Sequence, residues 1–234
     1  MNELFSRTTA LLGEDALIKL QRAKVAVFGL GGVGGQVAES LARAGVGTLV
    51  LIDHDTVSVS NINRQVIALL STVGEKKTAV MGRRIKDINP DCSVIEKDLF
   101  FLPDCDETII TPDMAYVADC IDTVSGKLEI ISQAQALNVP VISALGTGNK
   151  LCPEQLRIGD IAETEVCPLA RVMRRELKKR EIHHLPVVWS PEVPQPTKLF
   201  EGEKPIPGSI SFVPPAAGLL MASKIIRDII ERSN

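Results

Sequence analysis

The sequence contains few cysteines, and their spacing does not match a zinc site or a disulfide framework. The chain has 234 residues and five cysteines: Cys92, Cys105, Cys120, Cys152 and Cys167. An odd number without a Cys-x-x-Cys pair is not typical of zinc ribbons or of small secreted folds. We therefore expect reduced thiols, a cytoplasmic protein and no bound zinc.

Long apolar runs, aromatic residues and excess charge are also scarce. Apolar stretches such as 216–221 are far shorter than the roughly 20 residues that span a bilayer. Residues 1–7 lack the basic and then apolar pattern of a signal peptide. The formal net charge of −3 means that any contact with nucleic acid requires a local basic patch. Because the apolar stretches are short, we expect no membrane association, and because aromatic residues make up only 3% of the chain, we expect little stacking on bases.

Short apolar segments alternate with amphipathic segments over the first 150 residues. Strands are expected at 24–30, 48–53, 93–96, 116–122 and 139–144, and helices at 8–22, 33–44, 75–89 and 127–137. Regular alternation of strands and helices is typical of parallel sheets with helices on both faces. The sequence therefore predicts an α/β fold with a doubly wound, mainly parallel, Rossmann-like sheet.

Proline is concentrated near the carboxyl end. Eight of the fourteen prolines lie between Pro186 and Pro215, which argues against a central strand there. We expect a flexible loop over about 163–208 and a terminal helix at 217–230. The chain is thus expected to form one domain over 1–234, with a nucleotide-binding core at 1–150 and a substrate-binding extension at 151–234.

A glycine-rich turn stands between the first strand and the following helix. Gly29, Gly31 and Gly34 fit the pattern G-x-G-x-x-G, with Gly32 inside it. Such glycines allow a tight turn, close approach of the backbone to phosphate, and close packing of helix on strand. Asp53 ends the second strand, where its carboxylate can accept hydrogen bonds from ribose hydroxyls. This motif predicts a nucleotide site and does not distinguish ATP from NAD.

Three charged residues after the motif favour ATP over NAD as the bound nucleotide. Arg64 and Lys77 can stabilise charge on phosphates during adenylyl transfer, and Asp122 can hold Mg²⁺. An NAD-dependent oxidoreductase has no need of this set, because the pyrophosphate of its cofactor is not cleaved. Taken singly, Arg64 and Lys77 fit surface charges and Asp122 fits a strand-end turn, so that alternative stays open.

The combined motifs resemble the ThiF/MoeB/HesA superfamily, the bacterial relatives of ubiquitin-activating enzymes. The resemblance is carried by the glycine turn at 29–35, the run from Asp53 to Gln65, Lys77, and the segment from Asp119 to Asp122. It implies a homodimeric doubly wound enzyme that adenylates a carboxylate with ATP and Mg²⁺. Arg7 matches the arginine that, in this superfamily, reaches into the site of the neighbouring subunit.

The same resemblance assigns roles around the nucleotide. It places Asp53 at the ribose and Asp122 at the magnesium ion. It places the other nucleotide-binding side chains around the phosphates, namely Asp55, Asn61, Arg64, Gln65 and Lys77.

The sequence resembles one branch of the superfamily more closely than another. The sulfur-carrier adenylating branch has two Cys-x-x-Cys pairs, which this chain lacks. The chain resembles more closely the dehydratases that act on threonylcarbamoyladenosine in tRNA, through the segments 12–17, 71–74, 87–90, 168–171 and 207–209. That branch adenylates the threonine carboxylate, which then cyclises with loss of water.

Three alternatives to that dehydratase function stay open. Whether a monovalent cation binds is also open. The chain is alternatively a ThiF/MoeB-type adenylating enzyme for a small ubiquitin-like sulfur carrier, or a non-enzymatic nucleotide-binding adaptor for a cysteine desulfurase. An NAD-dependent oxidoreductase is the third. A monovalent cation is a further candidate ligand, although residues 145–149 replace the glycine-rich segment of the proteobacterial enzymes with side chains.

A basic segment near residue 175 is the candidate tRNA contact. Arg171, Arg174, Arg175 and Lys178 share one face of a helix, as a footprint for phosphates requires. The alternative is an ordinary solvated helix. Cys167, just before this segment, is a candidate acyl or sulfur acceptor, with a structural thiol as the alternative. A cysteine desulfurase or a sulfur-acceptor protein is accordingly a candidate partner.

Overall fold

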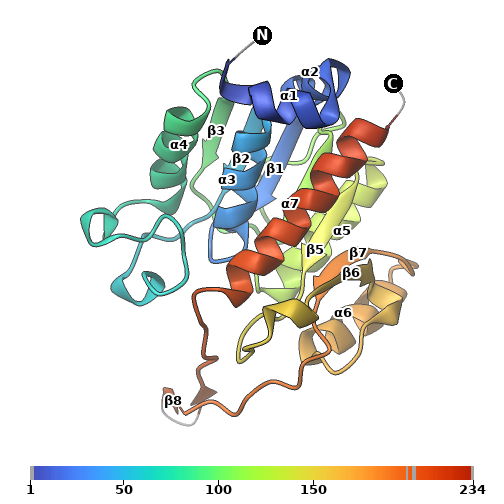
Figure 1. Cartoon of the computed structure of the whole chain (residues 1–234). Coiled ribbons are helices and arrows are strands. Elements are labelled where there is room, and N and C mark those ends of the chain that lie inside the picture. Colours follow the sequence, from blue (N-terminus) through green and yellow to red (C-terminus); the bar gives the residue numbers. More distant parts are fainter. Residues whose placement is uncertain (1–2, 199, 202–203, 233–234) are drawn as a thin grey trace.

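The centre of the structure is a seven-stranded sheet with the order β3-β2-β1-β4-β5-β7-β6 (Figure 1). This computed structural model describes residues 3–198, 200–201 and 204–232. Neighbouring strands pair in parallel except for β6, which is antiparallel to β7. The mainly parallel, doubly wound sheet is therefore confirmed. The strands are β1 (Lys24–Phe28), β2 (Thr48–Ile52), β3 (Ser93–Lys97), β4 (Tyr116–Asp119), β5 (Val141–Ala144), β6 (Arg157–Asp160) and β7 (Pro186–Trp189).

Helices cover both faces of this sheet. Successive residues of a strand point to opposite faces, so Val27 packs with α3, α4 and α7 while Phe28 packs with α5 and α6. Over the described residues, no helix is long and apolar enough to cross a membrane. The helices are α1 (Ser6–Leu12), α2 (Glu14–Arg22), α3 (Gly34–Ala44), α4 (Lys77–Ile88), α5 (Val124–Ala136), α6 (Pro168–Lys178) and α7 (Val213–Glu231).

Most differences from the expected elements lie at their ends, and one helix is divided. The expected helix at 8–22 is two helices, α1 and α2, because the chain turns at Gly13. Gly13 has φ of +87°, a conformation that interrupts a helix and that glycine adopts without strain.

The expectation of a loop over 163–208 without a central strand is wrong. This stretch contains α6 and β7, and β7 lies inside the sheet between β5 and β6. Pro186 is the first residue of β7, where a missing N–H is tolerated, and Val187 and Val188 continue the strand. A short hairpin of β8 (Phe200–Glu201) and β9 (Lys204–Pro205) follows, while residues 199, 202 and 203 lie outside the described residues. One continuous sheet therefore contains strands from both the expected core and the expected extension.

A buried ion pair joins the strands at the middle of the sheet. The Lys127 side chain on α5 and the Asp119 side chain on β4 are both 0% exposed, and their charged atoms are 2.9 Å apart. Lys127 Nζ also donates to Ser143 Oγ at 3.0 Å and to the carbonyl oxygen of Ala144 at 2.7 Å. The three donors of one ammonium thus fasten α5 to β4 and β5.

We predict that Lys127→Met lowers the free energy of unfolding by about 3 to 5 kcal/mol, because it leaves Asp119 buried without its cation. Lys24→Met is the matched control. Lys24 pairs with Asp113 at a similar distance of 3.0 Å, but both side chains reach solvent, so its loss should cost less than about 1 kcal/mol. Denaturant unfolding of the two variants checks the difference, and equal losses would contradict the prediction.

Candidate active site

A cavity of about 750 Å³ opens at the carboxyl ends of the parallel strands. Residues after β1, β2, β4 and β5 line it, together with the start of α6 and the start of α7. The strand order reverses between β1 and β4, and ligands of doubly wound sheets bind at such a reversal. The fold therefore places the loops that carry the predicted site residues around one cavity.

The glycine turn forms one wall of this cavity. Gly29 has φ of +84°, and a Cβ there would lie 3.0 Å from the carbonyl oxygen of Cys120. A Cβ on Gly34 would lie 1.7 Å from the carbonyl oxygen of Gly29, so Gly34 serves the packing of the turn and does not line the cavity. Gly31 has open space on its cavity side, where the nearest atom to an added Cβ is Gln65 Nε2 at 3.8 Å. The turn thus presents backbone to the cavity at the start of α3, as anion binding requires.

Asp53 holds this turn against β2. Its Oδ2 accepts from the backbone N–H of Leu30 at 2.6 Å, and its Oδ1 accepts from the N–H of Asp55 at 2.9 Å. A carboxylate has about four lone-pair sites, so these bonds leave acceptor capacity toward the cavity. The Asp53 side chain is therefore both a brace for the turn and a candidate ribose acceptor.

Lys77 reaches the cavity because the chain folds back on itself. Lys76 forms an antiparallel bridge with Thr56, and the Lys77 N–H donates to the carbonyl oxygen of Asp55 at 3.1 Å. Lys77 Nζ then lies 2.7 Å from Asp55 Oδ2 and 4.0 Å from Asp53 Oδ1. Partial burial acts to raise the pKa of the Asp55 carboxyl, but the hydrogen bond and charge of Lys77 outweigh it, so this pKa lies below its usual value. Lys77 is only 5% exposed, which does not fit the alternative of an ordinary surface charge.

The turn at 58–65 adds two polar groups beside the glycines. Arg64 Nη1 donates to the carbonyl oxygen of Ser60 at 2.9 Å and to Asn63 Oδ1 at 3.0 Å, and the residue lines the cavity. Gln65 is 7% exposed, and its buried Oε1 has no hydrogen-bond partner among the described residues. Buried acceptors are rarely left unpaired, so this atom is available to a donor or a cation in the cavity. Asn61 lines the same wall, and its Oδ1 accepts from the N–H of Ser58 at 3.1 Å.

Asp122 and Cys167 line other parts of the cavity. Asp122 is exposed in the segment after β4, and no hydrogen bond or ion pair ties its carboxylate to the described residues. A free carboxylate in the same cavity as Arg64 and Lys77 fits the oxygen ligands that Mg²⁺ prefers. Cys167 is 4% exposed just before α6, and its Sγ would lie 3.5 Å from a Cβ on Gly146.

One cation in the cavity is absent from the sequence-based prediction. Lys150 follows β5, is 4% exposed, and its Nζ donates to the carbonyl oxygen of Ser190 at 2.9 Å. Burial lowers the pKa of its ammonium, while the nearby Cys167 and Glu192 act in the opposite direction. Ser190 and Glu192 lie about 40 positions further along the chain, and Cys167 lies 17 positions further, so no local spacing could have revealed this group.

The structure does not bring Arg7 to this cavity. Pro214 at the start of α7 packs beside Gly32, whereas Lys19 on α2 donates to the carbonyl oxygen of Ile230 near the other end of α7. At 1.5 Å per residue, these two points on α7 are about 24 Å apart. Exposed Arg7 lies on α1, which packs on α2 at that distant end of the sheet (Figure 1).

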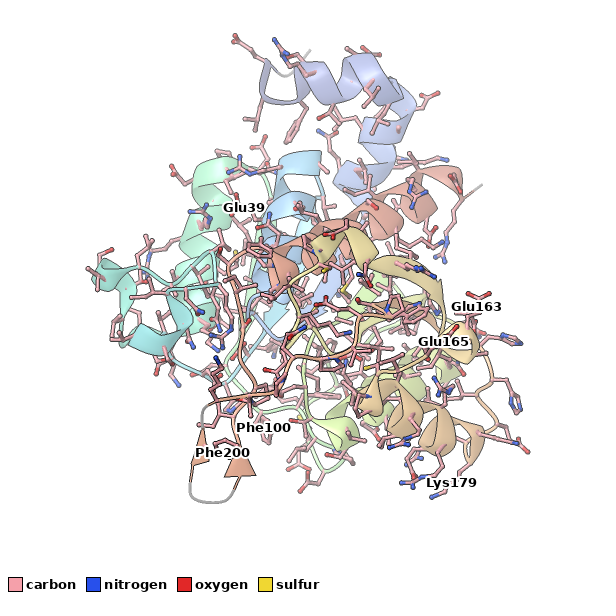
Figure 2. All side chains as sticks on the ribbon, turned by 60° about the horizontal axis from the view of Figure 1, so that its bottom comes forward. Glu39, Phe100, Glu163, Glu165, Lys179 and Phe200 are labelled. Carbon is pink, nitrogen blue, oxygen red and sulfur yellow. The ribbon has the colours of Figure 1, made fainter. Side chains whose placement is uncertain are left out.

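The basic residues of α6 also lie outside the cavity lining. The apolar face of α6, which includes Met173, packs in the core, and Lys179 at its end points outward (Figure 2). Arg174 donates to the carbonyl oxygen of Thr164 at 2.7 Å and to its hydroxyl, so it braces α6 and is not a free cation. Arg171, Arg175 and Lys178 are exposed as expected.

Comparisons with known proteins agree with this geometry. The chain is 37% identical over 241 residues to tRNA threonylcarbamoyladenosine dehydratase of Bacillus subtilis (strain 168), covering 97% of this chain and 94% of that protein. Crystal structures of E. coli tRNA N6-threonylcarbamoyladenosine dehydratase, TcdA, in complex with AMP and with ATP superpose with TM-scores of 0.86 and 0.85. Both are 32% identical and cover 97% of this chain and 94% of theirs.

A second group of relatives matches a smaller part of the chain. The sulfur carrier protein ThiS adenylyltransferase of Escherichia coli (strain K12) is 36% identical over 140 residues, which cover 58% of this chain and 55% of that protein. A family model described as the ThiF family matches residues 5–232. The chain therefore belongs to the ThiF family.

Proposed function

We propose that this chain is an ATP-dependent dehydratase that acts on threonylcarbamoyladenosine in tRNA. The observation that carries the proposal is the cavity wall formed by open Gly31, the unpaired Gln65 Oε1 and the cations Arg64 and Lys77. The backbone at Gly31 and the two cations suit the phosphates of a nucleotide, and the Gln65 Oε1 acceptor suits a cation bound beside them. The similarity to the Bacillus subtilis dehydratase over 97% of this chain supports tRNA as the second substrate.

The chemistry begins with a carboxylate that is a poor electrophile. A carboxylate oxygen of the threonyl group attacks the α-phosphorus of ATP, and the bond to pyrophosphate breaks. The nitrogen or oxygen of the neighbouring carbamoyl group then attacks the acyl carbon, and AMP leaves with one carboxylate oxygen. The net loss from the nucleoside is one water, and the two reacting groups share a side chain, which gives a high effective concentration.

The residues of this chain supply positioning and charge for those steps. Arg64 and Lys77 stabilise negative charge on the phosphates, and Asp53 accepts from the ribose. Asp122 and the Gln65 amide oxygen are the groups that would hold Mg²⁺, which neutralises phosphate charge when bound. No protein thiol is needed, and the burial of Cys167 disfavours exchange of sulfur with a partner protein.

Adenylation of a sulfur-carrier protein is the second candidate. The similarity to the ThiS adenylyltransferase favours it, although that similarity covers only 58% of this chain. The two functions differ in the acceptor that stimulates exchange of pyrophosphate into ATP. We expect tRNA carrying threonylcarbamoyladenosine to stimulate pyrophosphate exchange, and a small protein ending in Gly-Gly to have no effect. On this function the enzyme works in the cytoplasm, where its tRNA substrate is found.

We predict that Lys77→Met reduces ATP-dependent loss of water from the modified nucleoside by roughly 10²-fold or more, because one preorganised charge at the phosphates is lost. Mass spectrometry of nucleosides from the treated tRNA measures the reaction. Lys76→Met is the control, since Lys76 pairs with Asp98 on the surface and should retain near-normal turnover. Unchanged turnover in Lys77→Met would contradict the assigned role.

The exposed face of α6 is the proposed contact with tRNA phosphates. Arg171 and Lys178 are exposed and make no ion pair with the described residues. We predict that Arg171→Glu with Lys178→Glu weakens tRNA binding and lowers the dependence of log affinity on log salt by roughly one to two units, while ATP binding is unchanged. Filter binding at several salt concentrations tests this. The same charge changes at Arg83 and Lys86 on α4 serve as the control, and equal losses in both pairs would reject α6 as the contact.

We further propose that the active form is a homodimer in which Arg7 serves the partner's cavity, since it is too far from its own. Arg7→Ala and Asp122→Asn should each abolish most activity alone. Random exchange of subunits makes about half of the dimers mixed, and each mixed dimer has one site with both defects and one with none. Activity should therefore recover to about a quarter of the normal level. If Arg7 acted within its own chain, every site would keep one defect and no recovery would follow proven exchange.

A further inference from the structure

Lys150 is a buried ammonium without an ion-pair partner. Its Nζ makes one hydrogen bond, to the carbonyl oxygen of Ser190, and no carboxylate within the described part of the chain lies at ion-pair distance from it. The nearby Glu192 carboxylate is taken by two backbone donors, the N–H groups of Leu151 and Cys152, at 2.8 and 3.0 Å. A buried cation is unfavourable unless an anion compensates it, and Glu192 acts on Lys150 only from beyond ion-pair distance, so an anion bound here would stabilise the ammonium.

The other cations that line the cavity are already engaged. Lys77 is paired with Asp55, and the Arg64 guanidinium is bound to Ser60 and Asn63. Both belong to the wall that carries the glycine turn. Lys150 belongs to a separate wall, formed by the loop after β5, where two of its three donors remain without a partner among the described residues.

Lys150 also lies where the main cavity meets a second one of about 340 Å³. Asn149, its neighbour, fixes this junction. The Asn149 N–H donates to the carbonyl oxygen of Gly208 at 2.8 Å, its Oδ1 accepts from the Gly208 N–H, and its carbonyl oxygen accepts from the Gln195 N–H at 2.7 Å. Asn149, Lys150, Gly208 and Ser209 line both cavities, so a ligand larger than a nucleotide could contact Lys150 from either one.

We propose that Lys150 binds the carboxylate of the acceptor substrate and positions it for attack on ATP, an inference that rests on the proposed function. The carboxylate and the triphosphate repel one another, so an ammonium on a different loop of the same cavity would bring the two anions together without binding ATP itself. A charge-assisted hydrogen bond in a water-poor cavity is strong enough to select an acid over its neutral ester. The pKa of Lys150, lowered by burial in the free protein, rises again when the carboxylate binds.

The test compares two ligands that differ only in this charge. Synthetic RNA stem–loops carrying threonylcarbamoyladenosine, either as the free acid or as its methyl ester, are titrated in the presence of a non-hydrolysable ATP analogue. We expect the wild-type protein to prefer the acid, and Lys150→Met to reduce that preference by about 10- to 100-fold. Lys150→Arg, which keeps the charge, should restore most of it. ATP affinity should be the same in all three proteins.

Two further results separate this role from a structural one. If Lys150 only ties down Ser190, Lys150→Met should lower the midpoint of thermal unfolding and weaken acid and ester equally, which would overturn the proposal. We expect an unchanged or higher midpoint, because a buried charge is removed. Lys198→Met is the matched control, since Lys198 is exposed and lines only the second cavity, and its acid-to-ester ratio should stay normal. A wild-type protein that binds modified and unmodified stem–loops equally would count against the proposed function itself.

Discussion

The burial of the Lys127 ammonium is the constraint on which the site depends. An ammonium that is 0% exposed must be matched by a carboxylate, and Asp119 supplies it at 2.9 Å. This requirement fixes β4 and β5 against α5 at the point where both strands end. The loops that leave these ends carry Asp122 and Lys150, so this ion pair holds two neighbouring parts of the cavity lining in register.

The other buried lysines show how an enzyme of this kind distributes its charge. Lys77 has a carboxylate partner in the free protein, so it is held in place before a nucleotide arrives and adds little unfavourable energy. Lys150 has only a carbonyl oxygen, and the unfavourable energy of burying it stays until an anion binds. A preorganised cation suits phosphates that are always part of ATP. A cation left unpaired suits the step that selects one acceptor among many, because only the correct anion compensates it.

The part of the fold that the sequence predicts is the part that depends on local pattern. The glycine turn, Asp53 and the strand–helix alternation each rest on residues close together in the chain. Lys77 was identified from its charge and spacing, but its burial depends on the bridge between Thr56 and Lys76. Other contacts between distant segments could not be predicted either, because they depend on how the whole chain folds and not on local pattern. β7 forms despite Pro186 because β5 and β6 flank it, and Arg174 is engaged because Thr164 folds against it.

Two long-range contacts connect residues beyond 150 to the wall that carries the glycine turn and to the loop after β5. Asn63, beside Arg64, donates through Nδ2 to the carbonyl oxygen of Ser209 at 3.0 Å, and Gly208 is in turn bonded to Asn149. Gly208 and Ser209 therefore link the turn at 58–65 to the loop that carries Lys150. On the proposed function, the core supplies a reaction common to many carboxylates. The loop that carries Lys150 and the extension bonded to it then select which carboxylate reaches ATP, because residues of both line the cavity.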